Sequence, residues 1–116
     1  MIFNREELYA TFLDNEEMIL SLLSRFIERT EGQMKTFPEL IEAENYQSAS
    51  PIAHMIKGAA FTMSGGELGR AAGCLELLLK KTGDEKPEKK EIEEAFSSLQ
   101  NCFEQFKKEA EKFLNK

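Results

Sequence analysis

The chain has a single histidine, His54, and it lies in the segment Ala53-His54-Met55-Ile56-Lys57-Gly58. On a helix, Lys57 at i+3 and Gly58 at i+4 lie beside the imidazole. A neutral imidazole is a competent nucleophile near pH 7, because its unperturbed pKa is about 6.5. A neighbouring ammonium group would balance negative charge on the ring, and glycine, which costs a helix interior about 1 kcal/mol against alanine, would leave room for a bulky group. This pattern favours a histidine that accepts a phosphoryl group.

The helical periodicity of residues 50–64 predicts that His54 faces solvent. With about 100° of rotation per residue, one side of the helix carries an apolar stripe that we expect to be buried. Its members are Ile52, Ile56, Ala59 and Met63, flanked by Met55 and Ala60. The opposite side carries His54, Lys57, Gly58 and Phe61.

Composition favours an all-α protein. The 116 residues suffice for one domain with a single core, and no second domain or repeat is evident. Valine and tryptophan are absent, while leucine, glutamate, lysine and alanine are abundant, so helices are favoured over strands. Short links between helices favour antiparallel neighbours. We therefore expect an antiparallel four-helix bundle over about residues 14–114, preceded by a short N-terminal helix.

Capping signals predict where the helices begin and end. Asn4 with Glu7 and Asp14 with Glu17 fit capping boxes, and Phe3 with Leu8 fits a hydrophobic staple. Ser50-Pro51 predicts the start of the helix that carries His54, and Gly65-Gly66 predicts its end. Gly32 could stop the second helix, and Pro38 either kinks a helix or begins the next one. The fifth helix is expected to close near Gly83, before the connector Asp84-Glu85-Lys86-Pro87.

The final helix shows the most regular apolar spacing in the chain. Steps of four and three residues join Ile92, Phe96, Leu99, Phe103, Phe106, Ala110 and Phe113, which predicts a seam against other helices. Cys74 and Cys102 lie inside apolar-periodic segments, and we interpret them as small core residues in a reducing compartment.

Charge and motif content argue against several functions. The net charge of −6 disfavours binding to nucleic acid or to an anionic membrane surface. No apolar stretch approaches the roughly 18 residues that span a bilayer, and the N-terminus does not fit a secretory signal, so we expect a cytoplasmic protein. One histidine and two separated cysteines do not form a metal site, and no glycine-rich nucleotide loop is present.

The segment Ala53-His54-Met55-Ile56-Lys57-Gly58-Ala59-Ala60, followed by Met63, Gly65, Leu68 and Leu75-Glu76, resembles the histidine-containing phosphotransfer (HPt) domain. That family carries its histidine in this octet pattern, inside a four-helix bundle, and a later helix bears a leucine-glutamate pair. The order of the helices extends the resemblance over nearly the whole chain. Position 61, usually small in the family, is phenylalanine here.

The resemblance implies a phosphorelay carrier without kinase activity of its own. His54 would accept a phosphoryl group from a receiver-domain aspartate or from a sensor histidine kinase, including a hybrid one, and pass it to another receiver. Lys57 would support the phosphoryl charge, Gly58 would leave room for it, and Phe61 would either shield the imidazole or offer the receiver an apolar contact. We favour docking for Phe61. The resemblance implies no cofactor of the chain's own, because the receiver supplies Mg²⁺.

A helical adaptor without phosphotransfer activity is the alternative function. Retention of both His54 and Lys57 favours the carrier, since an adaptor needs neither.

Overall fold

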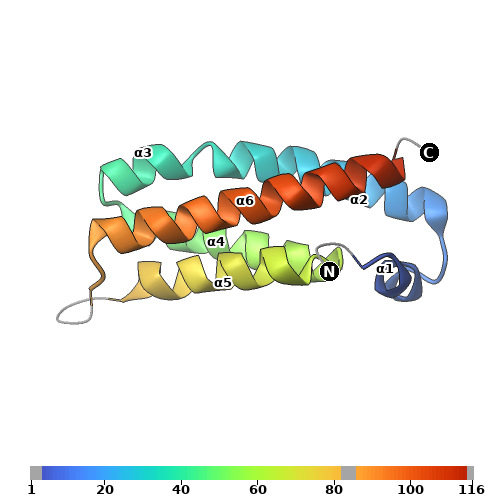
Figure 1. Cartoon of the computed structure of the whole chain (residues 1–116), viewed down its shortest axis with the longest axis horizontal. Helices are drawn as coiled ribbons and strands as arrows, with labels where there is room; N and C mark the ends of the chain where they lie inside the picture. The colour runs from blue at the N-terminus through green and yellow to red at the C-terminus, as the bar shows by residue number, and fades with distance from the viewer. Residues whose placement is uncertain (1–3, 82–85, 115–116) are drawn as a thin grey trace.

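Six helices follow one another in the computed structural model, which describes residues 4–81 and 86–114 and contains no strand within them. They are α1 (Arg5–Thr11), α2 (Glu16–Met34), α3 (Phe37–Glu42), α4 (Tyr46–Thr62), α5 (Gly66–Lys80) and α6 (Lys89–Leu114). The four long helices α2, α4, α5 and α6 form an elongated bundle, with α3 continuing beyond α2 and α1 at the opposite end (Figure 1). The predicted all-α bundle with a short N-terminal helix is confirmed.

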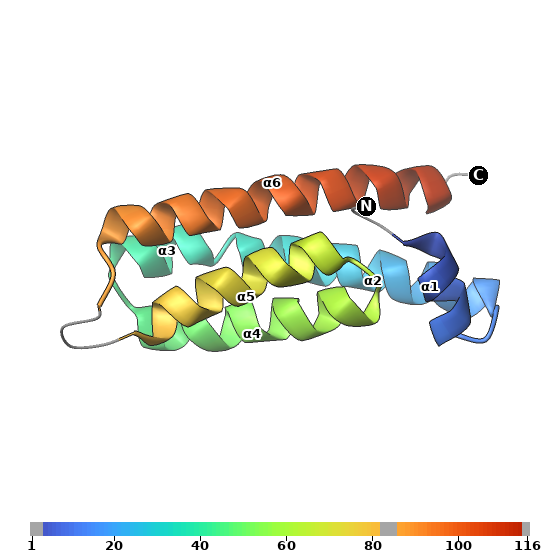
Figure 2. The same ribbon diagram turned by 60° about the horizontal axis from the view of Figure 1, so that its bottom comes forward.

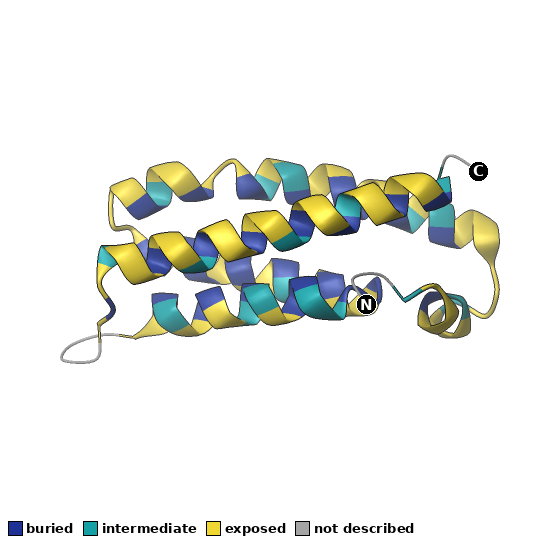
Figure 3. Cartoon of the chain, viewed as in Figure 1, coloured by how far each residue is buried: buried dark blue, intermediate teal, exposed yellow. Residues whose placement is uncertain are grey.

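Helix α6 supplies the longest apolar seam of the core. All seven of its predicted seam residues are buried: Ile92, Phe96, Leu99, Phe103, Phe106, Ala110 and Phe113. Figure 3 shows the other side of α6 exposed along its length. Helices α4 and α5 form an antiparallel hairpin that lies beside α6 (Figure 2). The period of about 3.6 residues therefore sets which side of each helix enters the core.

The N-terminal cap of α1 agrees with the sequence, whereas that of α2 lies one residue later than predicted. The Asn4 side chain accepts a hydrogen bond from the Glu7 backbone N–H at 3.0 Å. Phe3, half of the predicted staple, lies outside the described residues. At α2 the cap is Asn15, which accepts from the Met18 N–H at 3.0 Å. Asp14 does not cap the helix, because its backbone is left-handed at φ 60°.

The helix that carries the histidine begins before Ser50-Pro51, so that prediction was wrong. Asn45 caps α4 by accepting a hydrogen bond from the Ser48 N–H at 3.3 Å. Tyr46 and Ala49 are buried on the core side of α4, so packing extends the helix toward the N-terminus. Proline is tolerated inside α4 at the cost of one backbone hydrogen bond.

Helix α2 continues through Gly32 to Met34. Pro38 lies in the first turn of α3, so it begins a helix rather than kinking one.

Cys74 is exposed, so the prediction that it is a core residue was wrong; it lies off the buried stripe of α5. Cys102 is partly buried against the core. The predicted closure near Gly83 lies outside the described residues.

The turn between α4 and α5 depends on a close contact. Ser64, not a glycine, adopts the left-handed conformation there, with φ 61°. A Cβ atom on Gly65 would lie 2.8 Å from Cε2 of Phe106, which is fully buried. Glycine at position 65 therefore lets α6 pack tightly against the turn.

No helix among the described residues has the length and apolar content needed to cross a membrane.

Gly65→Ala should destabilise the fold by about 1–3 kcal/mol, because the added methyl group overlaps a ring that the core prevents from moving. Gly32→Ala is the matched control: a Cβ there meets nothing within 4 Å, and alanine should stabilise α2 by up to about 1 kcal/mol. Urea denaturation of both variants measures these changes. Equal stability of the two variants would contradict the close contact.

Candidate functional site

The buried face of α4 is rotated from the one that the sequence predicted. It contains Ala49, Ala53, Ile56 and Ala60, all fully buried, whereas Met55 and Ala59 are exposed. Of the predicted stripe, Ile56, Ala60 and Met63 are buried as expected and Ile52 is half-buried, so the prediction was wrong for Met55 and Ala59. Ala49 and Ala53 extend the buried face toward the start of the helix, because their small side chains are covered completely in close packing.

His54 remains on the exposed side of α4, as predicted. Its side chain is 63% exposed, and its Nδ1 atom lies 2.8 Å from Oε2 of Glu76 on α5. Among residues 4–81 and 86–114, Nδ1 is the one ring nitrogen with a protein partner. The Glu76 carboxylate holds the ring at Nδ1, and the ring edge that carries Nε2 stays open.

Glu76 is the centre of a charged cluster. Its side chain is 4% exposed, yet it also contacts two ammonium groups. Nζ of Lys57 lies 2.8 Å from Oε1, and Nζ of Lys80 lies 2.8 Å from Oε2. A buried carboxylate needs such partners, because an unpaired buried charge is strongly unfavourable. The cluster contains one carboxylate and two ammonium groups, so it keeps a net charge of +1 when the imidazole is neutral.

The charge state of Glu76 determines the tautomer of His54. Burial alone would raise the pKa of the Glu76 carboxyl, but hydrogen bonds from Lys57, Lys80 and His54 outweigh it and lower the pKa from 4.5 to about 2. Glu76 is therefore ionised at neutral pH and only accepts hydrogen bonds. The proton of a neutral imidazole must then lie on Nδ1, which leaves the lone pair on Nε2.

Two glycines of α5 accommodate two side chains of α4. A Cβ on Gly73 would lie 3.2 Å from Cδ of Lys57, and a Cβ on Gly69 would lie 2.8 Å from the ring of Phe61. The Lys57 stem and the Phe61 ring thus pass over bare backbone of α5. This contact directs the Lys57 ammonium group toward Glu76.

Open space surrounds the imidazole on two sides. A Cβ on Gly58 would meet nothing within 4 Å, so the packing of the chain does not itself require glycine there. A hollow of about 340 Å³ lies beside His54. Its lining residues are Ser50, Pro51, His54, Met55, Glu76 and Lys80. Phe61, 46% exposed, is not among them.

Sequence reasoning grouped His54, Lys57 and Gly58 correctly on one face but gave no role to Glu76 or Lys80. Two signals were present. Glu76 lies on the buried side of α5, among apolar residues such as Leu75. A carboxylate that is buried in this way requires a partner. Lys80 lies at i+4 from Glu76, the spacing of a helical ion pair.

A family model described as "Hpt domain" matches residues 21–111. The match spans α4 and α5 and therefore includes His54, Lys57, Gly58, Glu76 and Lys80. No curated protein and no solved structure matches the chain.

Acid should weaken the fold through Glu76. Its pKa is about 2 in the folded state and near 4.5 when unfolded, so the stabilisation by its ionised form is complete above pH 4.5 and is lost as the pH falls toward 2. This group should remove about 3 kcal/mol from the free energy of unfolding over that interval. Urea denaturation at several pH values measures how the free energy of unfolding falls with pH. The fall that Glu76 causes should be absent in Glu76→Gln. Glu94→Gln, on the exposed side of α6, is the control, and equal slopes for both variants would contradict the assignment.

Proposed function

Because the chain belongs to the Hpt domain family, whose members transfer phosphoryl groups in phosphorelays, we propose that His54 carries the phosphoryl group between receiver-domain aspartates. The observation that carries this proposal is the exposed imidazole held at Nδ1 by a buried, ionised carboxylate. That arrangement leaves Nε2 as an accessible nucleophile. The proposal includes a sensor histidine kinase as a second donor, and the chain itself acts as a carrier rather than a kinase.

The transfer is a displacement at phosphorus. The Nε2 lone pair of His54 attacks the phosphorus of an aspartyl phosphate, the N–P bond forms, and the P–O bond breaks with its electron pair going to the leaving aspartate carboxylate. Nδ1–H donates to Glu76 throughout, so the positive charge that develops on the ring is stabilised by the carboxylate. Transfer to a second receiver reverses these steps.

Lys57 and Lys80 balance the incoming negative charge. Both ammonium groups contact Glu76, and Lys80 also lines the hollow beside His54. Because the cluster has a net positive charge, it favours a phosphoryl group over a neutral ligand.

The surface around His54 suits a protein partner. Between Glu44 and Glu67 the only Lys, Arg, Asp or Glu is Lys57, in a chain of which 31% of residues are charged. Met55 and Phe61 are 43% and 46% exposed on this surface, and the space at Gly58 is open. We propose that a cytoplasmic receiver domain docks here, with Phe61 as an apolar contact, and that the receiver supplies the Mg²⁺.

A helical adaptor without transfer activity is the second candidate. An adaptor has no use for a buried carboxylate that orients a solvent-exposed imidazole. The chemistry of this cluster therefore favours the carrier.

Incubation with a phosphorylated receiver domain and Mg²⁺ should label the protein with phosphate that is labile in acid and stable in base. His54→Gln should reduce this label to background, because the amide has no nucleophilic nitrogen. The fold should persist, since the side chain at position 54 is largely exposed. Label that survives in the variant would contradict the assignment of His54 as the residue that accepts the phosphoryl group.

Gly58→Leu should slow transfer from the receiver at least tenfold, because the new side chain occupies the space through which the receiver approaches. The variant should melt at or above the wild-type temperature, since position 58 is open and leucine favours helix. Gly58→Ala is the graded control and should transfer at an intermediate rate. Unchanged transfer in Gly58→Leu would show that the receiver does not pass over α4 there.

A further inference from the structure

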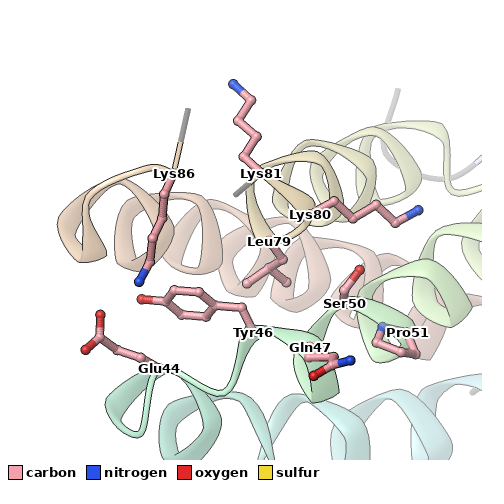
Figure 4. A pocket seen from close by; sticks show the side chains of 9 residues that line it. All are labelled: Glu44, Tyr46, Gln47, Ser50, Pro51, Leu79, Lys80, Lys81 and Lys86. Carbon is pink, nitrogen blue, oxygen red and sulfur yellow. The ribbon is translucent and has the colours of Figure 1, made fainter. Parts of the chain in front are cut away.

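Two ammonium groups reach the Glu76 carboxylate by different routes. Lys80 comes from the same helix, at i+4, and its side chain is 59% exposed. Figure 4 shows it extending from α5 on the side of Ser50 and Pro51. Lys57 comes from α4, and its side chain is only 33% exposed although it ends in a charge. Most of the Lys57 stem is therefore covered by protein on its way to Glu76.

The backbone of α5 at Gly73 lies under that stem. A Cβ atom on Gly73 would lie 3.2 Å from Cδ of Lys57 and 3.9 Å from Cγ. Apart from the chain neighbours of Gly73 and the backbone of α5, no other part of residues 4–81 and 86–114 would lie within 4 Å of that atom. Glycine inside a helix is unfavourable relative to alanine. At position 73 it is the Lys57 stem, rather than core packing, that a larger residue would displace.

The place of the Lys57 ammonium group is linked to the imidazole through one carboxylate. Nζ of Lys57 lies 2.8 Å from Oε1 of Glu76, and Nδ1 of His54 lies 2.8 Å from Oε2. A lysine side chain has many rotamers, and fixing it costs conformational entropy. Because the contact at Gly73 confines the middle of the stem, the ammonium group lies near the ring before a phosphoryl group arrives.

We propose that Gly73 is a positioning residue for phosphoryl transfer: it seats the stem of Lys57, whose ammonium group then balances the charge of a phosphoryl group on Nε2 of His54. The proposal rests on the function proposed above. A larger side chain at position 73 would push the stem off α5, and the ammonium group would move away from Glu76 into solvent. Lys80 would keep its bond to Glu76, because its stem does not cross Gly73.

Gly73→Leu in the full chain tests this role with the small donor phosphoramidate, whose reaction does not depend on docking of a receiver. We expect labelling of the variant to be about fivefold slower than that of the wild type and close to that of Lys57→Ala, since Lys80 still supplies one positive charge. Gly66→Leu is the matched control on the same helix, where a Cβ would lie 3.2 Å from Nη1 of the exposed Arg70. The control should be labelled at the wild-type rate, and equal slowing of both leucine variants would overturn the proposal.

The combination with Lys57→Ala distinguishes positioning from a merely structural role. Adding Gly73→Leu to Lys57→Ala should cause no further loss of rate, because the stem that leucine displaces is absent. The same fold-loss in both backgrounds would overturn the proposal. Gly73→Ala shifts the stem by less, so it should give a smaller loss with the same dependence on Lys57. This variant carries the test if Gly73→Leu does not fold.

An NMR measurement separates this inference from the proposed function. The Nζ–H₃⁺ group of Lys57, bonded to a buried carboxylate, should exchange slowly with water and give a signal that Lys57→Ala removes. Gly66→Leu should keep that signal, and Gly73→Leu should lose it. If phosphoramidate and receivers both leave wild-type His54 unlabelled, the carrier function is wrong and the transfer role of Gly73 falls with it, although the signal still reports whether the stem is seated. If the wild type is labelled and Gly73→Leu matches it in rate or in signal, only the positioning role is overturned.

Discussion

The carboxylate of Glu76 joins three side chains that reach it from two helices. His54 and Lys57 come from α4 and Lys80 from its own helix, each within 2.8 Å. The carboxylate is buried, so it stays in place only while these partners offset its desolvation. In return it orients the imidazole and gathers positive charge beside it. The structural and chemical properties of the site thus depend on one interaction.

The hairpin of α4 and α5 sets the register that brings these groups together. The tight turn at Ser64 and Gly65 returns the chain so that α5 runs back along α4. Gly73 then lies under the stem of Lys57, and Glu76 lies under His54. The large residues of α6 hold the hairpin from the other side, with the ring of Phe106 against the turn. A change in core packing at the turn would therefore be transmitted to the site.

Helix positions were predictable from apolar spacing, but helix ends were less so. Local signals competed at two starts, Asp14 against Asn15 and Ser50 against Asn45, and in both cases the asparagine became the cap. The second outcome follows from burial of Tyr46, which no local rule includes. The rotation of α4 was misjudged for a related reason: the neighbours of a helix, not the size of its apolar residues, decide which side is covered.

By itself the sequence determined that the protein is helical, which residues form the seam of α6, and that His54, Lys57 and Gly58 share one side of a helix. These properties follow from a period that repeats along a single segment of chain. Only the tertiary structure decided that Glu76 and Lys80 complete the site and that Nδ1 is the ring nitrogen held by the protein. His54 and Glu76 lie 22 residues apart, and a contact across that separation is set by the turn and by packing between helices, which no local pattern encodes.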